Sequence, residues 1–343
     1  MPCTEEVRVM SEHFVKYIRI KQYKCFNNFS AEGFKRVNLI SGKNNIGKTA
    51  LMETCFISVA SDSVKTFVRS LDLINYLRTN LDNNGEKANS KKRSEQLTKL
   101  AGLLKISTNV SSVSFNYDDS DVVRSYKFAV NENVHAVSES SMDVEAIIQN
   151  TPKFKNKRLY IPSTGLAQNE IIRSFAAIQK KDREADVNRI LMQFDSSIEN
   201  VKIIGGDSIQ CKVSGGGESF FYHSIDEFGD GLRHYLSIVA DLFNAENGYV
   251  FIDELDNGIH YTSLDQLWEI ILSLSKELNV QVFATTHSKE CIESYCRAAE
   301  KLKDEDISFI TLVKNKEKAV KAIVRDYEVF TDSIHDEREV RGW

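Results

Sequence analysis

The sequence predicts an α/β fold with a mainly parallel central sheet, and three observations support this prediction. In the last third of the chain, apolar runs of strand length alternate with segments of helical periodicity, as they do in parallel sheets covered by helices. Near the start, the apolar run at 36–41 leads through a glycine-rich turn into a helical segment. Only three of the 343 residues are prolines, so few helices are interrupted and long helices are expected.

The composition limits the class of protein. Hydrophobic residues make up 42% of the chain and charged residues 27%, which is typical of soluble globular proteins. The net charge of -5 disfavours non-specific nucleic-acid binding over the whole surface but leaves room for a local basic groove. The six cysteines show no metal-binding spacing and no secretory segment is evident, so we expect reduced thiols and a cytoplasmic protein. No apolar run approaches the ~20 residues needed to cross a bilayer, so no membrane partner is expected.

In the N-terminal half, alternating residues at 14–20 predict a half-buried strand, and 36–41 predicts a second one. The polar segment 61–105 predicts two helices joined by a charged loop. Two β-prone runs within 107–130 then predict an antiparallel hairpin, followed by a polar connector. We interpret 61–156 as an insertion that separates residues 1–60 from the rest of the core.

The C-terminal part, 157–343, completes the expected core and includes a helical lobe at about 165–245. A hairpin is predicted to turn on Gly215–Gly217; a phosphate loop is the alternative, although no helix start or Lys-Ser/Thr follows it. The expected elements are a strand at 157–163, helices within 166–199, a helix at 230–244, a strand at 249–253, a helix at 262–278, a strand at 280–286 and a helix from 288.

The segment "GKNNIGKT", residues 42–49, fits the pattern G-x-x-x-x-G-K-[ST] between a predicted strand and a predicted helix. The two glycines let the backbone curl so that N–H groups and the helix dipole face phosphate oxygens. Lys48 would reach the β- and γ-phosphates of ATP, and the Thr49 hydroxyl would ligate Mg²⁺. The expected ATP-binding residues of this loop are Gly42, Asn44, Asn45, Ile46, Gly47, Lys48, Thr49 and Ala50.

A second motif lies at the end of the apolar run 249–252, where Asp253 and Glu254 follow each other. The strand brings Asp253 to the carboxyl edge of the sheet, where ligands of open α/β folds bind. One carboxylate in the outer shell of Mg²⁺ and a second beside the attacking water would suit ATP hydrolysis. The alternative is that both acids only decorate a strand end or cap the next helix.

Together these motifs resemble the ABC-type ATPase class, most closely the branch that includes the OLD family and the RecF-like and SMC-like heads. "IRIKQYKCF" resembles the lead-in strand and turn of that branch, with Lys24 near the nucleotide. "VFIDELDNGIH" resembles its Walker B motif and D-loop, and "ATTHS", 284–288, its switch-histidine strand end. The resemblance implies an ABC-ATPase-like P-loop NTPase head with a mainly parallel core sheet, an antiparallel β subdomain and a helical insertion.

The resemblance also implies roles for single residues. Asp253 would hold Mg²⁺ through water, Glu254 would polarise the attacking water, and His287 would sense the γ-phosphate, with Lys48 as the third catalytic residue. His260 lies where the family has its D-loop histidine, and its role would be architectural or dimer-facing.

The segment "IDEFGDGLRHYL", 225–236, occupies the place of the ABC signature, which caps the nucleotide of the opposing protomer. Gly229 and Gly231 would supply N–H donors to the γ-phosphate. The usual serine is absent, and Glu227 and Phe228 stand in its neighbourhood. The resemblance therefore implies a homodimer or higher homo-oligomer closed by ATP, with slow hydrolysis; an ordinary glycine-containing helix start is the alternative.

A Q-loop glutamine that contacts Mg²⁺ is expected at Gln168, although Gln179 is also available and a solvated loop glutamine is the commoner outcome. Two basic clusters could each contact a phosphate backbone, although a solvated charged face is the preferred interpretation; the first cluster is the better candidate for a nucleic-acid or partner contact. They consist of Lys87, Lys91, Lys92 and Arg93, and of Lys153, Lys155, Lys157 and Arg158.

The leading functional hypothesis is an OLD-like ATPase that regulates a separately encoded effector, a nuclease or another toxin, in bacterial defence against phage. Full-length OLD proteins carry a Toprim nuclease domain after the ATPase, and this chain leaves no room for one. A transporter subunit is a poorer match, because its D-loop and signature would read differently. The alternatives are a RecF-like or SMC-like DNA-repair ATPase that clamps DNA itself, and a scaffold that binds ATP with little turnover.

Overall fold

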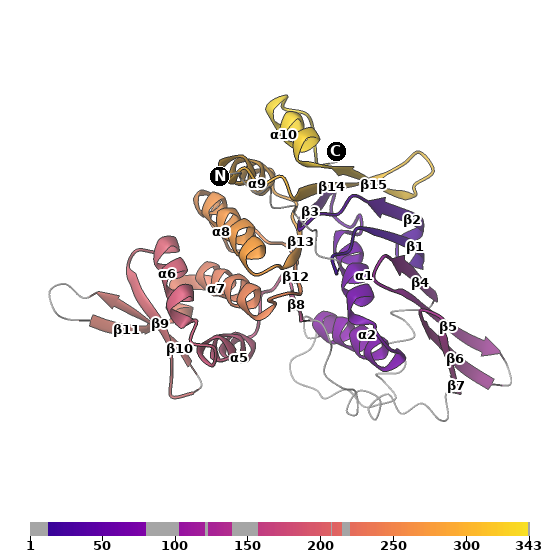
Figure 1. Cartoon of the computed structure of the whole chain (residues 1–343), viewed down its shortest axis with the longest axis horizontal. Helices are drawn as coiled ribbons and strands as arrows, with labels where there is room; N and C mark the ends of the chain where they lie inside the picture. The colour runs from indigo at the N-terminus through magenta and orange to yellow at the C-terminus, as the bar shows by residue number, and fades with distance from the viewer. Residues whose placement is uncertain are drawn as a thin grey trace, which may run out of the picture.

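The computed structural model describes residues 13–79, 103–120, 123–138, 157–206, 208–214 and 220–341. A central, mainly parallel sheet separates two groups of elements, and an antiparallel sheet lies at each end of the elongated molecule (Figure 1). The predicted α/β class is confirmed.

The central sheet has the strand order β15-β14-β3-β13-β12-β8, and all neighbouring pairs are parallel except β14 with the edge strand β15. Three of the interior strands, β3, β13 and β12, are buried along their whole length, which explains their mostly apolar sequences. The strands are β3 (Val37–Gly42), β8 (Arg158–Ile161), β12 (Tyr249–Ile252), β13 (Gln281–Thr285), β14 (Ile307–Lys314) and β15 (Val320–Arg325).

Residues of β12 alternate between the two faces of the sheet. Val250 and Ile252 join the core beneath the C-terminal helices, whereas Tyr249 and Phe251 join the core around the N-terminal helices. One face is covered by α7 (Gly229–Asn244), α8 (Leu264–Glu277), α9 (Lys289–Leu302) and α10 (Tyr327–His335), and the other by α1 (Lys48–Ala60) and α2 (Val64–Thr79). A short helix, η3 (Tyr261–Ser263), precedes α8.

The second sheet is antiparallel, in the order β2-β1-β4-β5-β6-β7. The hairpin expected within 107–130 is confirmed, because β5 and β6 pair from Val113 with Val130 to Ser120 with Val123. The strands of the expected insertion, however, do not form a sheet of their own: β4 pairs with β1, so they extend the N-terminal hairpin. The strands are β1 (Tyr17–Tyr23), β2 (Phe26–Glu32), β4 (Leu103–Thr108), β5 (Ser112–Ser120), β6 (Val123–Val130) and β7 (Asn133–Ser138).

The lobe at 165–245 contains a third, three-stranded antiparallel sheet in the order β11-β10-β9. The hairpin of β10 with β11 is confirmed by its pairing, while its glycine run, Gly215–Gly217, lies outside the described residues. The elements are α5 (Gln168–Gln179), α6 (Glu184–Phe194), β9 (Ile198–Ile204), β10 (Ser208–Ser214), β11 (Phe220–Ser224) and η2 (Ile225–Phe228). Among the helices of the described residues, none combines the length and hydropathy needed to cross a bilayer.

Candidate nucleotide-binding and catalytic site

The loop between β3 and α1 has the backbone that the P-loop pattern requires. Gly42, Asn45 and Gly47 have positive φ angles of 147°, 60° and 113°, which glycine and asparagine tolerate better than other residues. Space is limited as well, since a Cβ on Gly47 would lie 2.5 Å from Sγ of Cys25. This loop therefore curls tightly at the N-terminus of a 13-residue helix, the arrangement that binds phosphate groups.

The Lys48 side chain lies along the inside of this loop. Its Nζ donates hydrogen bonds to the carbonyl oxygens of Gly42, at 3.0 Å, and Lys43, at 3.3 Å. Burial lowers the pKa of Lys48, while the nearby carboxylates, with Glu254 the largest contributor, act in the opposite direction. The ammonium group is thus held where phosphate oxygens can replace carbonyl oxygens as acceptors.

Asp253 connects three elements at the carboxyl edge of the sheet. The Thr49 hydroxyl donates to both carboxylate oxygens, at 3.1 and 3.0 Å, and the Thr285 hydroxyl donates to Oδ1 at 2.6 Å. Asp253 is only 7% exposed, and burial raises its pKa, which these two hydroxyl donors partly offset. The carboxylate is therefore fixed in orientation between the end of β12, the start of α1 and the end of β13.

Glu254 follows directly and adopts the left-handed region, with φ of 51°, which is uncommon for a residue with a side chain. Its N–H donates to the Thr285 hydroxyl at 2.8 Å. Thr285 thus orients both acids, a role that the sequence motif did not reveal. His287 is exposed two residues beyond Thr285 and lines the same cavity as Glu254.

Lys24 is tied to the P-loop helix by an ion pair. Its Nζ lies 2.6 Å from Oε2 of Glu53, and the Tyr23 hydroxyl donates to the same oxygen at 3.0 Å. Glu53 is 1% exposed, so it presents a buried negative charge to a lysine at the rim of the cavity. The sequence reading found Lys24 but not Glu53, which carries no motif of its own.

These residues surround a cavity of about 520 Å³. Most of the predicted site residues line it together, whereas Gly42 forms the loop below and the Ile46 side chain packs in the hydrophobic core, 4% exposed. The lining residues are Lys24, Cys25, Asn44, Asn45, Gly47, Lys48, Thr49, Ala50, Asp253, Glu254 and His287.

The donor set fits a nucleoside triphosphate with Mg²⁺. The Thr49 hydroxyl and the Asp253 carboxylate are hard oxygen ligands in contact with each other, as Mg²⁺ prefers. The loop amides and Lys48 supply the positive environment for phosphates, and Glu254 supplies a carboxylate next to them. Such an arrangement suits hydrolysis of a phosphoanhydride.

The signature-like residues lie apart from this cavity. Gly229 and Gly231 stand at the start of α7, and neither lines the cavity. Gly231 packs so closely on the D-loop that a Cβ would lie 2.5 Å from the carbonyl oxygen of Gly258. His234, one turn further on, has its Nε2 3.1 Å from the Leu255 carbonyl oxygen. The start of α7 therefore contacts the loop that follows Asp253 and Glu254.

Two other predicted residues lie outside the cavity. Gln168 is exposed at the first position of α5, and it is not among the lining residues, so its contact with Mg²⁺ stays a prediction. His260 is exposed before η3, with Nδ1 2.8 Å from the Thr262 hydroxyl.

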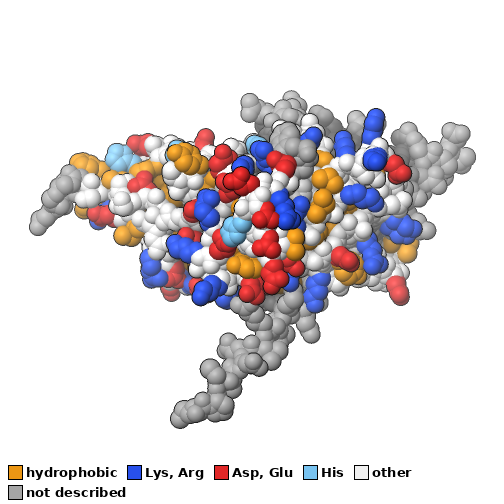
Figure 2. Space-filling view, turned by 90° about the horizontal axis from the view of Figure 1, so that it is seen from above, with side chains coloured by type: hydrophobic (Ala, Val, Ile, Leu, Met, Phe, Trp, Pro, Cys, Tyr) orange, Lys and Arg blue, Asp and Glu red, His pale blue; other side chains and the backbone are white. Residues whose placement is uncertain are grey.

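The basic clusters fall largely on residues outside the described ranges. Of their members, Arg158 is turned into the protein, where its guanidinium donates to the Val59 carbonyl oxygen at 3.1 Å and burial lowers its pKa to about 9. Both interpretations of this cluster, a solvated charged face and a contact for a phosphate backbone, are therefore wrong for Arg158, whose Nε and Nη2 atoms are buried. Figure 2 shows acidic and basic side chains interspersed on the face it displays, without a continuous basic surface among the described residues.

Comparison with known proteins agrees with this geometry. An "ATP/GTP phosphatase" of Helicobacter pylori is 25% identical, over 81% of this chain and 86% of that protein. The SmcHead bound to the C-winged helix domain of ScpA shares the fold, with a TM-score of 0.50, 11% identity and coverage of 92% of this chain and 98% of that one. The family model of the AAA ATPase domain matches residues 57–292, beginning after the P-loop and including both acids. The chain belongs to the AAA ATPase domain family.

Proposed function

We propose that this protein binds ATP with Mg²⁺ in the cavity described above, hydrolyses it, dimerises around it and regulates a separately encoded effector. The observation that carries the ATPase part is the placement of Asp253, held by Thr49 and Thr285, opposite Lys48 and beside Glu254. The effector, a nuclease or another toxin used against phage, is inferred from the resemblance to the OLD family as a whole and from no single residue. The phosphatase name of the Helicobacter pylori relative supports turnover of a nucleoside triphosphate.

Each residue of the site has a distinct task. Lys48 exchanges its carbonyl acceptors for phosphate oxygens, and the loop amides bind the remaining oxygens. Thr49 and Asp253 would hold Mg²⁺, which would supply positive charge to offset the negative charge of the phosphates. Glu254 accepts the proton of the attacking water, and His287, at the mouth of the cavity, contacts the γ-phosphate.

Dimerisation would place Gly229 and Gly231 of one protomer over the cavity of the other. Three carboxylates surround this helix start, those of Asp226, Glu227 and Asp230, and they oppose the approach of a phosphate. Arg233 lies close to two of them, at 3.3 Å from Asp226 and 3.5 Å from Asp230, and reduces this repulsion. The resulting weak complementarity supports slow turnover.

Hydrolysis is tested by phosphate release from ATP and, because of the relative's name, from GTP. Glu254→Gln should abolish turnover while nucleotide stays bound, and the dimer should accumulate in light scattering. Lys48→Ala should lose nucleotide affinity. Glu246→Gln, an exposed carboxylate at the loop after α7, is the matched control and should behave as wild type. Unchanged hydrolysis in Glu254→Gln would remove this residue from the mechanism.

The effector is tested by co-purification with the products of adjacent genes in the presence of ATP. Retention of a nuclease or toxin by the Glu254→Gln protein, and loss of it by Lys48→Ala, is expected. ATP-dependent, salt-sensitive binding of duplex DNA by the purified protein without any partner would instead support a clamp that acts on DNA directly.

A further inference from the structure

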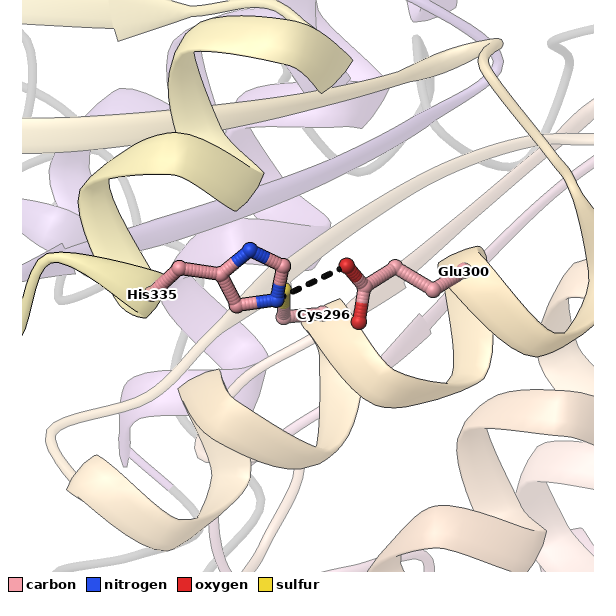
Figure 3. Close-up of side chains that lie close together, drawn as sticks. All are labelled: Cys296, Glu300 and His335. Carbon is pink, nitrogen blue, oxygen red and sulfur yellow. Dashed lines mark ion pairs between the residues drawn. The ribbon is translucent and has the colours of Figure 1, made fainter.

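Three potential metal ligands of different chemical types meet on the side of the molecule formed by α9 and α10. Cys296 and Glu300 are four residues apart on α9, so they lie on one face of that helix, and His335 is the last residue of α10. Their ligand atoms all lie within 4.8 Å of one another, with Nε2 of His335 3.0 Å from Oε1 of Glu300. Figure 3 shows the imidazole, the carboxylate and the thiol converging on one point.

We propose that Cys296, Glu300 and His335 bind one zinc ion, with a water molecule in the fourth position. Thiolate, imidazole and carboxylate are the three protein ligand types that Zn²⁺ accepts, and the combination of sulfur and nitrogen ligands disfavours Mg²⁺ and Ca²⁺. Ligand atoms around tetrahedral zinc lie about 3.3–3.8 Å apart at ordinary bond lengths. The separations in this cluster require only small side-chain adjustments to reach that range.

The three groups have a graded exposure that suits an ion entering from solvent. Cys296 is 1% exposed and forms the floor, whereas the side chains of Glu300 and His335 are 33% and 62% exposed and form the mouth. The fourth position therefore faces water.

The supporting elements are firmly packed. Tyr295, next to Cys296, has its ring 5.6 Å from Phe330 of α10, and Phe330 stacks on Phe309 of β14 at 4.7 Å between ring centroids. Ligands on rigid helices lose little conformational freedom when an ion binds.

An ion pair between His335 and Glu300 does not by itself require a thiol beside it, yet the Cys296 thiol lies there. The chain contains a second histidine–glutamate pair of similar length, His223 with Glu227, at 2.9 Å. That pair belongs to no group of three potential ligands among the described residues. It therefore serves as an internal reference for what a histidine and a glutamate do without the thiol.

The expected consequence of zinc binding is structural. None of the three residues lines the nucleotide cavity, but α9 begins directly after His287 and Ser288. A zinc ion would join the last turns of α9 to the end of α10 and so fasten the C-terminal helix to the body of the domain.

The test uses the full-length protein, freed of metal and titrated with Zn²⁺ or, as a spectroscopic probe, Co²⁺. One ion per chain is expected, with thiolate-to-cobalt charge-transfer absorption in the near ultraviolet. A rise in melting temperature of roughly 3 °C or more at saturating Zn²⁺, reversed by chelator, is also expected.

Cys296→Ser should remove the charge-transfer band, and His335→Ala should weaken zinc affinity about 100-fold or more, since even residues that only support ligands contribute about 10–100-fold. His223→Ala is the matched control and should bind as wild type. Substitution of the buried Cys296 can destabilise the protein on its own account. The exposed His335 can be replaced with little effect on folding, so loss of zinc binding in His335→Ala reports on the site itself. Binding of wild-type affinity in His335→Ala, or a band that persists in Cys296→Ser, would overturn the proposal.

Discussion

Replacing Thr285 with valine tests whether the orientation of Asp253 and Glu254 matters for activity, because both acids remain in the chain and only the hydroxyl that contacts them is lost. The substitution keeps the shape of the side chain but removes a hydroxyl that donates to Asp253 at 2.6 Å and accepts from the Glu254 N–H at 2.8 Å. A hydrogen bond to a charged group contributes about 1.5–3 kcal/mol and a neutral one about 1 kcal/mol, so the unfolding free energy should fall by about 2–4 kcal/mol. The Asp253 carboxylate would then be oriented by Thr49 alone.

Turnover should fall as well, in the fraction of protein that remains folded. We expect kcat to fall about 10–100-fold, the range measured when residues that orient metal ligands are removed, and the Mg²⁺ concentration needed for half-maximal rate to rise. Phosphate release at saturating ATP, followed across a Mg²⁺ titration, measures both.

Two further variants make the Thr285 experiment decisive. Thr285→Ser keeps the hydroxyl and should restore most of the activity. Thr331→Val removes a buried hydroxyl that contacts only the backbone of its own helix and should leave turnover unchanged. Wild-type kcat and Mg²⁺ dependence in a folded Thr285→Val protein would refute the assigned role.

Two other predictions concern the helical lobe. Asp241 is fully buried, accepts a hydrogen bond from Ser174 at 2.7 Å, and has its pKa raised by burial to about 7. Because the folded-state pKa lies above the unfolded value, stability is full at low pH, declines above about pH 4 and reaches its minimum a little above pH 7. At about 1.4 kcal/mol per pKa unit this loss is at most about 4 kcal/mol. Asp241→Asn should remove that dependence in urea unfolding from pH 5 to 8, and parallel curves for the two proteins would contradict it. Gly231→Ala places a methyl group 2.5 Å from the Gly258 carbonyl oxygen; it should cost about 1–3 kcal/mol of stability and lower ATP-dependent dimerisation in light scattering, whereas wild-type dimerisation would show that the D-loop is not coupled to α7.

The sequence predicted that most residues of the candidate nucleotide site would lie close together, because the signals of this site are local. The spacing of glycines before Lys48 and Thr49 specifies a loop whose geometry follows from backbone sterics, and an apolar run that ends in Asp253 specifies a strand and its edge. The parallel sheet followed from the alternation of strand and helix signals.

Contacts between distant segments were not predictable in the same way. Thr285 and Asp253 meet because β12 and β13 are neighbours in the sheet, and Glu53 meets Lys24 because α1 packs beneath the first hairpin. Nothing in the alternation of residues 103–138 indicates that their first strand pairs with β1. Likewise, Arg158 belongs to a run of basic residues that reads as a charged surface, although the strand turns its side chain inward.

The P-loop helix α1 has almost no contact with solvent, since twelve of its thirteen residues are buried and only Thr49 is partly open. It lies between the parallel sheet and the six-stranded antiparallel sheet that contains β1, β2 and β4 (Figure 1). Its apolar side chains belong to a core shared with these three strands. A displacement of Thr49 would therefore be transmitted to the residues packed around α1, because close-packed interiors transmit strain. The strands β1, β2 and β4 share this core with the helix that carries Lys48 and Thr49, so a shift of α1 would be transmitted to the sheet that they begin.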